Sequence, residues 1–168
     1  IPAGDGAALL ARIQLEGSAS DADIVLGLDT SLIATATATQ LFALHGKNQT
    51  INLPTGFSDP HFLPFDWGWF AFVHDKTRVP NAPKSFTELA ASDLQIVIQD
   101  PRSSTPGLGL LLWVKAAYGS RAEEVWEGLA DNIVTVTPGW SEAYGLFLEG
   151  EADMMSQIRQ ALSLGDTV

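Results

Sequence analysis

Cysteine is absent from the chain of 168 residues, and its absence excludes disulfide bonds, thiol nucleophiles and zinc sites of the usual cysteine type. The three histidines, His45, His61 and His74, are scattered without the short spacing of metal ligands, so we interpret each as an ordinary surface or boundary histidine. We therefore predict no metal site and no cofactor. Apolar runs are also short, and none reaches the roughly 18 residues that a membrane-spanning helix needs.

Basic residues are scarce as well. Lys and Arg number 9 against 20 Asp and Glu, which gives a net charge of −11. Such a charge disfavours binding to the phosphates of nucleic acids. It suits a cationic ligand, although solubility alone is the simpler explanation.

Familiar catalytic signatures are missing too. The sequence contains no G-x-S-x-G, no Walker-type phosphate loop and no G-x-G-x-x-G. No nucleophile with an adjacent base emerges from the residues. The sequence therefore favours a binding protein over an enzyme.

What the chain does contain predicts an α/β fold. Residues 4–17 have the spacing of a helix that is closed by Gly17. Residues 22–28 (ADIVLGL) read as a buried parallel strand that ends at Asp29, with a helix capped by Thr30 or Ser31 behind it. Strands followed by helices are typical of the α/β class.

The second half of the chain continues this alternation. The aromatic segment 62–75 is apolar on both faces, which predicts one or two strands through a core whose tryptophans are buried. Residues 94–99 and 132–137 read as strands. The remaining predictions are a capping box at Ser85 and Glu88, an amphipathic helix over 122–131, a helix capped by Ser141 that ends before Gly150, and a tail helix over 156–166 that Gly165 stops.

One stretch is unusually polar for a helix start. The sequence DPRSSTPGLGLLLW, from Asp100 to Trp113, leads from a predicted strand into a nearly all-round apolar helix that should be buried and stop at Gly119. Thr105 is the predicted N-cap, with Pro106 at the first helical position. Asp100 and Arg102 flank Pro101, and we interpret them as structural residues that pair with each other or with neighbours.

The three hydroxyls at this helix start, those of Ser103, Ser104 and Thr105, together with the free helical N–H groups, suit an anion such as phosphate. Simple capping needs only one hydroxyl, so capping and anion binding both remain open from the residues alone. The helix start also lies at the carboxyl end of a parallel strand, where ligands of open α/β sheets bind.

Other candidates carry similar alternatives. Trp140 follows a glycine at a strand exit and could stack on a planar ring or a cation, or it could be a core tryptophan. Asp5 and Gly6 resemble a loop at a helix start, and we interpret Asp5 as its cap. Asp29 ends a strand and could face a cationic ligand or cap the next helix, and capping is the simpler interpretation.

Four segments carry a family resemblance: ADIVLGLD, PFDWGWFAFVHDK, IQDPRSSTPGLGLLLW and VTVTPGWSEAYGLFLEGEAD. In register from about Asp5 to Asp153, the chain resembles the periplasmic thiamine-binding proteins of bacterial ABC-type uptake systems. The resemblance implies a type II periplasmic binding fold with two α/β lobes of mostly parallel sheets, a hinge of crossing strands and a ligand cleft. It also implies a signal-peptide-processed periplasmic protein that binds thiamine and thiamine phosphates and delivers them to an inner-membrane permease.

The resemblance also assigns site residues. Asp5 and Gly6 match a ligand-contacting Asp-Gly pair, Ser104 matches the serine at the phosphate end, and Trp140 matches a cleft tryptophan. We add their neighbours Thr105 and Ser141 as candidate ligand-binding residues. The acidic charge agrees with thiamine, whose thiazolium ring is a cation.

The family has an opening strand before the position of Ile1, and it continues beyond Asp153 for more than roughly a hundred residues. We expect residues 1–75 to form a partial first lobe with a crossing strand, 76–153 a second lobe, and 154–168 a tail unlike the family. The chain then reads as a fragment, a truncated product or a rearranged form. We expect the isolated chain to self-associate and to bind thiamine weakly or not at all.

The competing hypotheses are a receptor for an organophosphonate, a polyamine or iron on the same fold, a thiamine-processing enzyme, and a non-binding remnant. Iron is disfavoured because the chain has only two tyrosines, and the enzyme because it has no cysteine.

Overall fold

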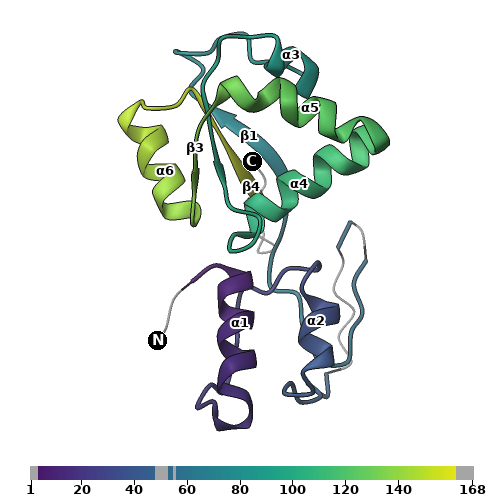
Figure 1. Cartoon of the computed structure of the whole chain (residues 1–168). Helices are drawn as coiled ribbons and strands as arrows, with labels where there is room; N and C mark the ends of the chain where they lie inside the picture. The colour runs from purple at the N-terminus through teal and green to yellow at the C-terminus, as the bar shows by residue number, and fades with distance from the viewer. Residues whose placement is uncertain (1–3, 48–52, 55, 162–168) are drawn as a thin grey trace. The chain divides into compact units, whose positions relative to one another are not determined.

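The computed structural model describes residues 4–47, 53–54 and 56–161 (Figure 1). The chain divides into two compact units, one formed by Ile1–Trp69 with Arg159–Val168 and the other by Phe70–Ile158. We call them unit 1 and unit 2 and describe each by itself. No helix in the described ranges is both long and apolar enough to cross a membrane.

Unit 1 begins with the predicted first helix. Helix α1 spans Gly6–Glu16 and buries Leu10 and Ile13 on one side. Its end is fixed by Gly17, whose φ of 55° lies in the left-handed region that glycine adopts without strain, and whose N–H bonds to the Ile13 carbonyl. Local signals therefore suffice to define this helix.

The predicted buried strand over residues 22–28 is wrong. In the structure this segment is no strand, and the side chains of Ile24 and Leu26 are 77% and 65% exposed. A parallel strand needs a neighbouring strand for its hydrogen bonds, and no described strand pairs with this segment. Helix α2, which spans Ile33–Ala38, also begins later than predicted, because Asp29 instead holds a turn by accepting the Ser31 N–H at 2.8 Å.

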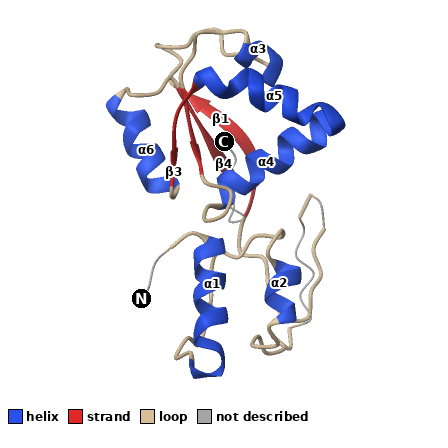
Figure 2. Cartoon of the chain, in the orientation of Figure 1, coloured by secondary structure: helices blue, strands red, loops and turns tan. Residues whose placement is uncertain are grey.

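The sheet of the structure has four strands in the order β1-β4-β2-β3, and β2 runs parallel to both of its neighbours (Figure 2). The two predicted strands at 94–99 and 132–137 are confirmed as β2 and β3, and the α/β class is confirmed with them. Their bounds are Trp67–His74 (β1), Ile96–Gln99 (β2), Ile133–Thr137 (β3) and Met154–Ala161 (β4).

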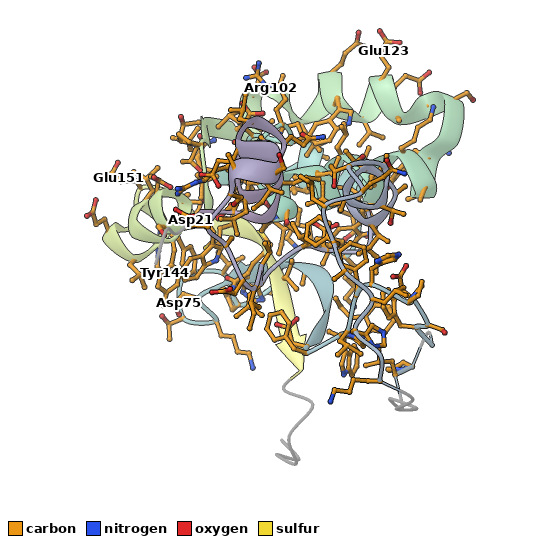
Figure 3. All side chains as sticks on the ribbon, turned by 90° about the horizontal axis from the view of Figure 1, so that it is seen from below. Asp21, Asp75, Arg102, Glu123, Tyr144 and Glu151 are labelled. Atoms are coloured by element: carbon orange, nitrogen blue, oxygen red, sulfur yellow. The ribbon has the colours of Figure 1, made fainter. Side chains whose placement is uncertain are left out.

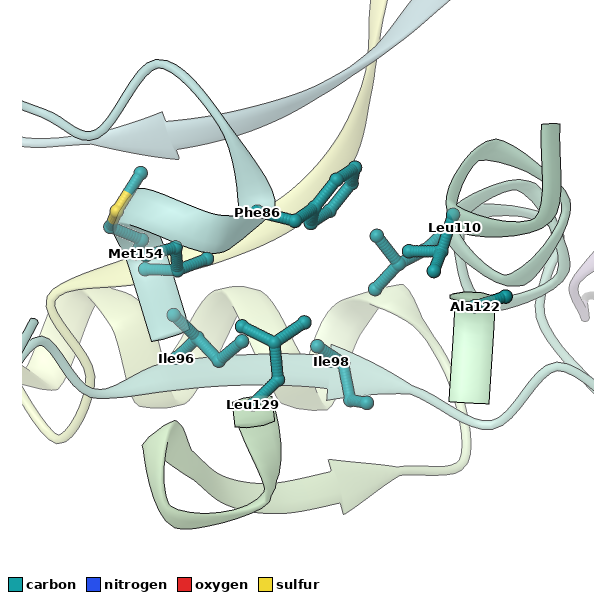
Figure 4. Close-up of a cluster of buried hydrophobic side chains, with 9 residues drawn as sticks. Phe86, Ile96, Ile98, Leu110, Ala122, Leu129 and Met154 are labelled. Atoms are coloured by element: carbon teal, nitrogen blue, oxygen red, sulfur yellow. The ribbon is translucent and has the colours of Figure 1, made fainter. Parts of the chain in front are cut away.

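Helices cover both faces of this sheet (Figure 1). Alternate residues of β2 supply the two cores: Ile96 and Ile98 pack with α3, α4 and α5 on one face, and Val97 packs with α6 on the other (Figure 4). The layers are thus α/β/α, as in other parallel sheets that are buried on both sides. The helices are α3 (Phe86–Ala90), α4 (Thr105–Tyr118), α5 (Ala122–Leu129) and α6 (Trp140–Glu149).

Several local predictions in unit 2 are confirmed. The Ser85 hydroxyl accepts the Glu88 N–H at 3.1 Å, which is the capping bond at the start of α3. Helix α4 ends at Gly119, with a φ of 59°, and α6 ends at Gly150, with a φ of 84°. Capping boxes and helix ends at glycine can be predicted from the sequence because they depend only on residues that are neighbours in the chain.

Two expectations of burial hold only in part. Strand β1 packs Phe72 and Val73 against the clusters on the two faces of the sheet, but Trp69 is 59% exposed and Phe70 39% exposed, so the start of the strand is not a core segment. Helix α4 is not buried all round either, because Leu111, Leu112 and Trp113 remain exposed on it. The described residues do not provide enough packing partners to cover these apolar side chains.

The predicted tail helix is a strand instead. Strand β4 pairs in parallel with β2 and buries Met155 completely. A buried pair fastens it: the Gln99 side-chain amide donates to the Ser156 carbonyl at 2.9 Å, and the Ser156 hydroxyl donates back to Gln99 Oε1 at 2.5 Å. Pairing with the sheet therefore overrides the local helical pattern, while Gly165 lies outside the described residues.

Candidate functional site

The carboxyl ends of β2 and β3 bring two polar loops together. Gln99 and Thr137 are register partners at the ends of these parallel strands. Beyond them the Asp100 N–H donates to the Thr137 carbonyl at 2.8 Å, and the Ser103 hydroxyl donates to the Pro138 carbonyl at 2.6 Å. The starts of α4 and α6 therefore lie at one edge of the sheet, where parallel α/β folds bind ligands.

Helix α4 approaches the end of β2 unusually closely. A Cβ atom built on Gly107 would lie 2.3 Å from the Gln99 carbonyl oxygen, which only glycine avoids. The N-cap is Ser104 rather than the predicted Thr105, and Pro106 is accordingly the second helical residue. The cap shifts by one residue because the Ser104 N–H already bonds to the Asp100 carbonyl at 2.9 Å and closes the turn there.

Ser104 is the most informative residue of this edge. Its side chain makes no capping hydrogen bond, although the residue occupies the N-cap position. The residue is fully buried, and its Oγ has no hydrogen-bond partner in the described part of the chain. Buried hydroxyls in proteins are nearly always bonded, so this Oγ is unusual, and it lies beside the positive end of a helix, where anions are favoured in general.

The other polar groups of the loop are occupied within it. Arg102 donates from Nε and Nη2 to the Asp100 carboxylate at 2.9 and 2.5 Å, and its guanidinium points outward (Figure 3). These hydrogen bonds lower the pKa of Asp100 to about 2. The interpretation of these two residues as structural is confirmed, because the cationic side chain of Arg102 is already paired with Asp100.

Trp140 begins helix α6 and lies at the surface. Its indole stacks on the ring of Tyr144, with centroids 4.8 Å apart and planes inclined by 13°, and the two residues are 36% and 37% exposed. The interpretation of Trp140 as a core residue is therefore wrong. The N-cap of α6 is Gly139, not Ser141, which is exposed as the second helical residue.

Tyr144 was not among the residues predicted from the sequence. Its signal was nevertheless present, since aromatic residues four positions apart on a helix face the same side. The Trp140–Tyr144 pair forms a flat, half-exposed aromatic surface of the kind that packs against planar or cationic groups.

Asp5 and Gly6 belong to unit 1 and start helix α1. Asp5 is the N-cap, and its backbone carbonyl accepts the Leu9 N–H at 3.0 Å. Its side chain makes no capping bond, however, and Oδ2 is buried without a partner among the described residues. The simple capping interpretation of this carboxylate is therefore wrong, and Asp5 shares with Ser104 the property of a buried, unbonded oxygen at a helix start.

No metal centre competes for these groups: across the described ranges, no set of three or more His, Asp or Glu side chains is arranged to hold a metal ion.

Comparisons with known proteins show which family this chain resembles. The family model for bacterial extracellular solute-binding proteins matches residues 20–158. A thiamine-binding periplasmic protein of Salmonella typhimurium is 53% identical over 154 residues, which cover 90% of this chain and 47% of that protein. Its counterpart in Brucella abortus is 52% identical over 158 residues, covering 92% of this chain and 47% of the relative.

A solved structure, named as a periplasmic thiamin binding protein, superposes on this chain with a TM-score of 0.89 at 49% identity. The superposition covers 93% of this chain and 50% of that structure. The chain thus spans about half the length of the relatives it matches. Because the family model covers most of its residues, the chain belongs to the bacterial extracellular solute-binding proteins, which are binding proteins rather than enzymes.

Proposed function

We propose that this chain is a portion of a periplasmic receptor for thiamine and thiamine phosphates, which serves an ABC permease of the inner membrane. The relatives that are about half identical to it carry the names of thiamine-binding periplasmic proteins. A family name alone does not select the ligand, so the proposal also depends on the chemistry of the residues.

The observation that carries the proposal is the buried, unbonded Ser104 Oγ at the start of α4. A phosphate ester at this position would accept a hydrogen bond from the Ser104 hydroxyl, and the positive end of the helix dipole would favour its negative charge. Thr105, the first residue of the same helix, is a neighbouring candidate. Because the Arg102 cation is taken up by Asp100, the phosphate is held by hydrogen bonds and the dipole rather than by a free arginine.

Thiamine also carries a planar pyrimidine ring and a cationic thiazolium ring. The stacked Trp140 and Tyr144 rings supply an aromatic surface for a planar group, with Ser141 beside them as a further hydroxyl. Within unit 1, Asp5 next to the buried Gly6 is a separate candidate, because its Oδ2 has no hydrogen-bond partner among the described residues and a carboxylate suits a cation. The groups of unit 2 match the phosphate and one planar ring of the ligand.

The test is a fluorescence titration with thiamine and with thiamine monophosphate, which reads the response of the tryptophans. It uses the chain itself and a chimera in which this chain replaces the matched part of the Salmonella typhimurium relative. We expect saturable binding of both ligands in the chimera and weaker binding in the isolated chain. A chimera that binds neither ligand while remaining folded by circular dichroism would refute the proposal.

A further inference from the structure

Unit 2 contains a groove that the candidate site does not use. This groove has a volume of about 600 Å³ and lies over β1, beside α3 and the second half of α4. None of Ser104, Thr105, Trp140 and Ser141 lines it. Its aromatic lining residues are Phe70, Phe72, Phe86, Trp113 and Tyr118.

The aromatic side chains of this groove form a cluster that is only partly covered. Phe86 contacts Trp113 edge-on with ring centroids 4.8 Å apart, and Tyr118 lies 6.1 Å from Phe86. Yet Trp113 is 37% exposed and Phe70 39% exposed. Large aromatic side chains around a concave apolar surface are characteristic of contact with another protein segment.

A polar atom in the groove also lacks a partner. His74 lines the groove, and its Nδ1 is buried without a hydrogen bond to any described residue. Buried ring nitrogens normally find a donor or an acceptor, so whatever covers the groove is expected to supply one. The groove therefore calls for an apolar segment with an occasional polar side chain.

The position of the groove indicates what kind of segment fits. Strand β1 stands at one end of the sheet order, and Phe72 joins the core on the same face as α3, α4 and α5. In layered α/β folds such a sheet face is covered by helices, and a helix presents apolar side chains on one stripe. A further helix laid across β1 beside α4 would complete this layer.

The comparisons indicate where this helix comes from. This chain superposes on a solved relative with a TM-score of 0.89 but covers only 50% of it, so the same fold exists there within a chain twice as long. We propose that the groove is the docking site of an amphipathic helix from the half of the family chain that this sequence does not span. The inference does not depend on thiamine binding.

A matched pair of substitutions on α4 tests this proposal. Ala117 lines the groove and is exposed, so Ala117→Glu places a charge in the groove without removing a packed side chain. Ala116→Glu is the control, because Ala116 is exposed on the same helix and does not line the groove. Both variants are made in the isolated chain and in the Salmonella chimera, and thermal unfolding is measured.

In the isolated chain both variants should unfold within about 2 °C of the parent, because both glutamates reach water. In the chimera Ala117→Glu should lower Tm by about 5 °C or more, or prevent folding, whereas Ala116→Glu should not, since only the first buries a charge under the docked helix. Equal Tm values for the two chimera variants would overturn the proposal.

Sedimentation of the isolated chain distinguishes the other occupant. If copies of the isolated chain pair through the uncovered groove, Ala117→Glu abolishes self-association and Ala116→Glu does not, which agrees with an apolar docking surface. A second copy is the true occupant only if the two chimera variants also have equal Tm values, and that result contradicts the proposal. The thiamine titration of the two chimera variants is scored separately, so a failed docking site and a failed ligand assignment are told apart.

Discussion

Replacing Gly107 by alanine should push helix α4 away from the sheet. The new methyl group would lie 2.3 Å from the Gln99 carbonyl oxygen and 2.7 Å from the Gln99 carbonyl carbon, whereas ordinary contact begins at 3.4 Å. The helix start must therefore retreat by the difference of 3.4 and 2.3, about 1.1 Å, because its obstacle is backbone rather than a flexible side chain. Overpacking of this kind costs about 1–3 kcal/mol.

Gly145→Ala is the matched control, since the same substitution in α6 meets nothing within 4 Å. Alanine is favoured over glycine within a helix by about 0.5–1 kcal/mol, so the control should stabilise the chain slightly. Urea denaturation followed by circular dichroism measures both free energies of unfolding. If Gly107→Ala is as stable as Gly145→Ala, the close packing of α4 on β2 is not as described.

Gly107→Ala should also weaken the proposed phosphate site, because Ser104 lies one turn earlier at the start of the same helix. A shift of about 1 Å spoils a hydrogen bond whose donor and acceptor must lie about 2.7–3.2 Å apart. In the chimera, thiamine monophosphate should lose more affinity than thiamine, and an unchanged ratio of the two dissociation constants would argue against a phosphate at this helix start.

Three further predictions concern single groups. Ser156→Ala leaves the buried Gln99 Oε1 without its hydrogen-bond donor, so the free energy of unfolding, measured by urea denaturation, should fall by about 1–3 kcal/mol. An unchanged free energy of unfolding would show that this hydrogen bond does not stabilise the fold. Because bonding to Arg102 lowers the pKa of Asp100 from 3.8 to about 2, the pair stabilises the fold above pH 3.8 and loses this contribution as the pH falls towards 2. Asp100→Asn should therefore flatten the dependence of Tm on pH in that window, and an unchanged slope would assign it to other carboxylates. Trp140→Ala should raise the thiamine dissociation constant of the chimera about tenfold through the loss of stacking, while Trp140→Phe should retain most of the affinity, and equal losses would contradict a stacking role.

The comparison of sequence and structure shows which signals are local. The end of α1 at Gly17, the cap at Ser85 and the stop at Gly119 were predictable because a few neighbouring residues determine each of them. The strand at 94–99 was predictable because four consecutive buried apolar or amide residues form it. These features required no knowledge of distant contacts.

Other features depend on partners that a sequence pattern does not reveal. Residues 22–28 have the composition of a strand, but without a neighbouring strand they leave Ile24 and Leu26 in water. The tail has the pattern of a helix, but its pairing with β2 and the bond between Gln99 and Ser156 make it β4. Here tertiary contact decides between two local preferences.

The candidate site was predicted in part. The resemblance and the polar cluster both indicated Ser104, but only the structure shows that its hydroxyl is buried and unbonded rather than capping. The same holds for the carboxylate of Asp5. Tyr144 was missed although its spacing from Trp140 is helical, because an aromatic stack on a helix surface resembles any other pair in sequence.

The most direct test of the central claim is the selectivity of Ser104→Ala in the chimera. If the Ser104 hydroxyl receives the phosphate ester, this variant should bind thiamine monophosphate about ten- to a hundredfold more weakly, as expected for a lost hydrogen bond to a charged group of about 1.5–3 kcal/mol. Its affinity for thiamine itself should change by less than about twofold, and Ser120→Ala, an exposed serine beyond α4, should leave both affinities unchanged. Equal losses for the two ligands in Ser104→Ala would contradict a phosphate site at the start of α4.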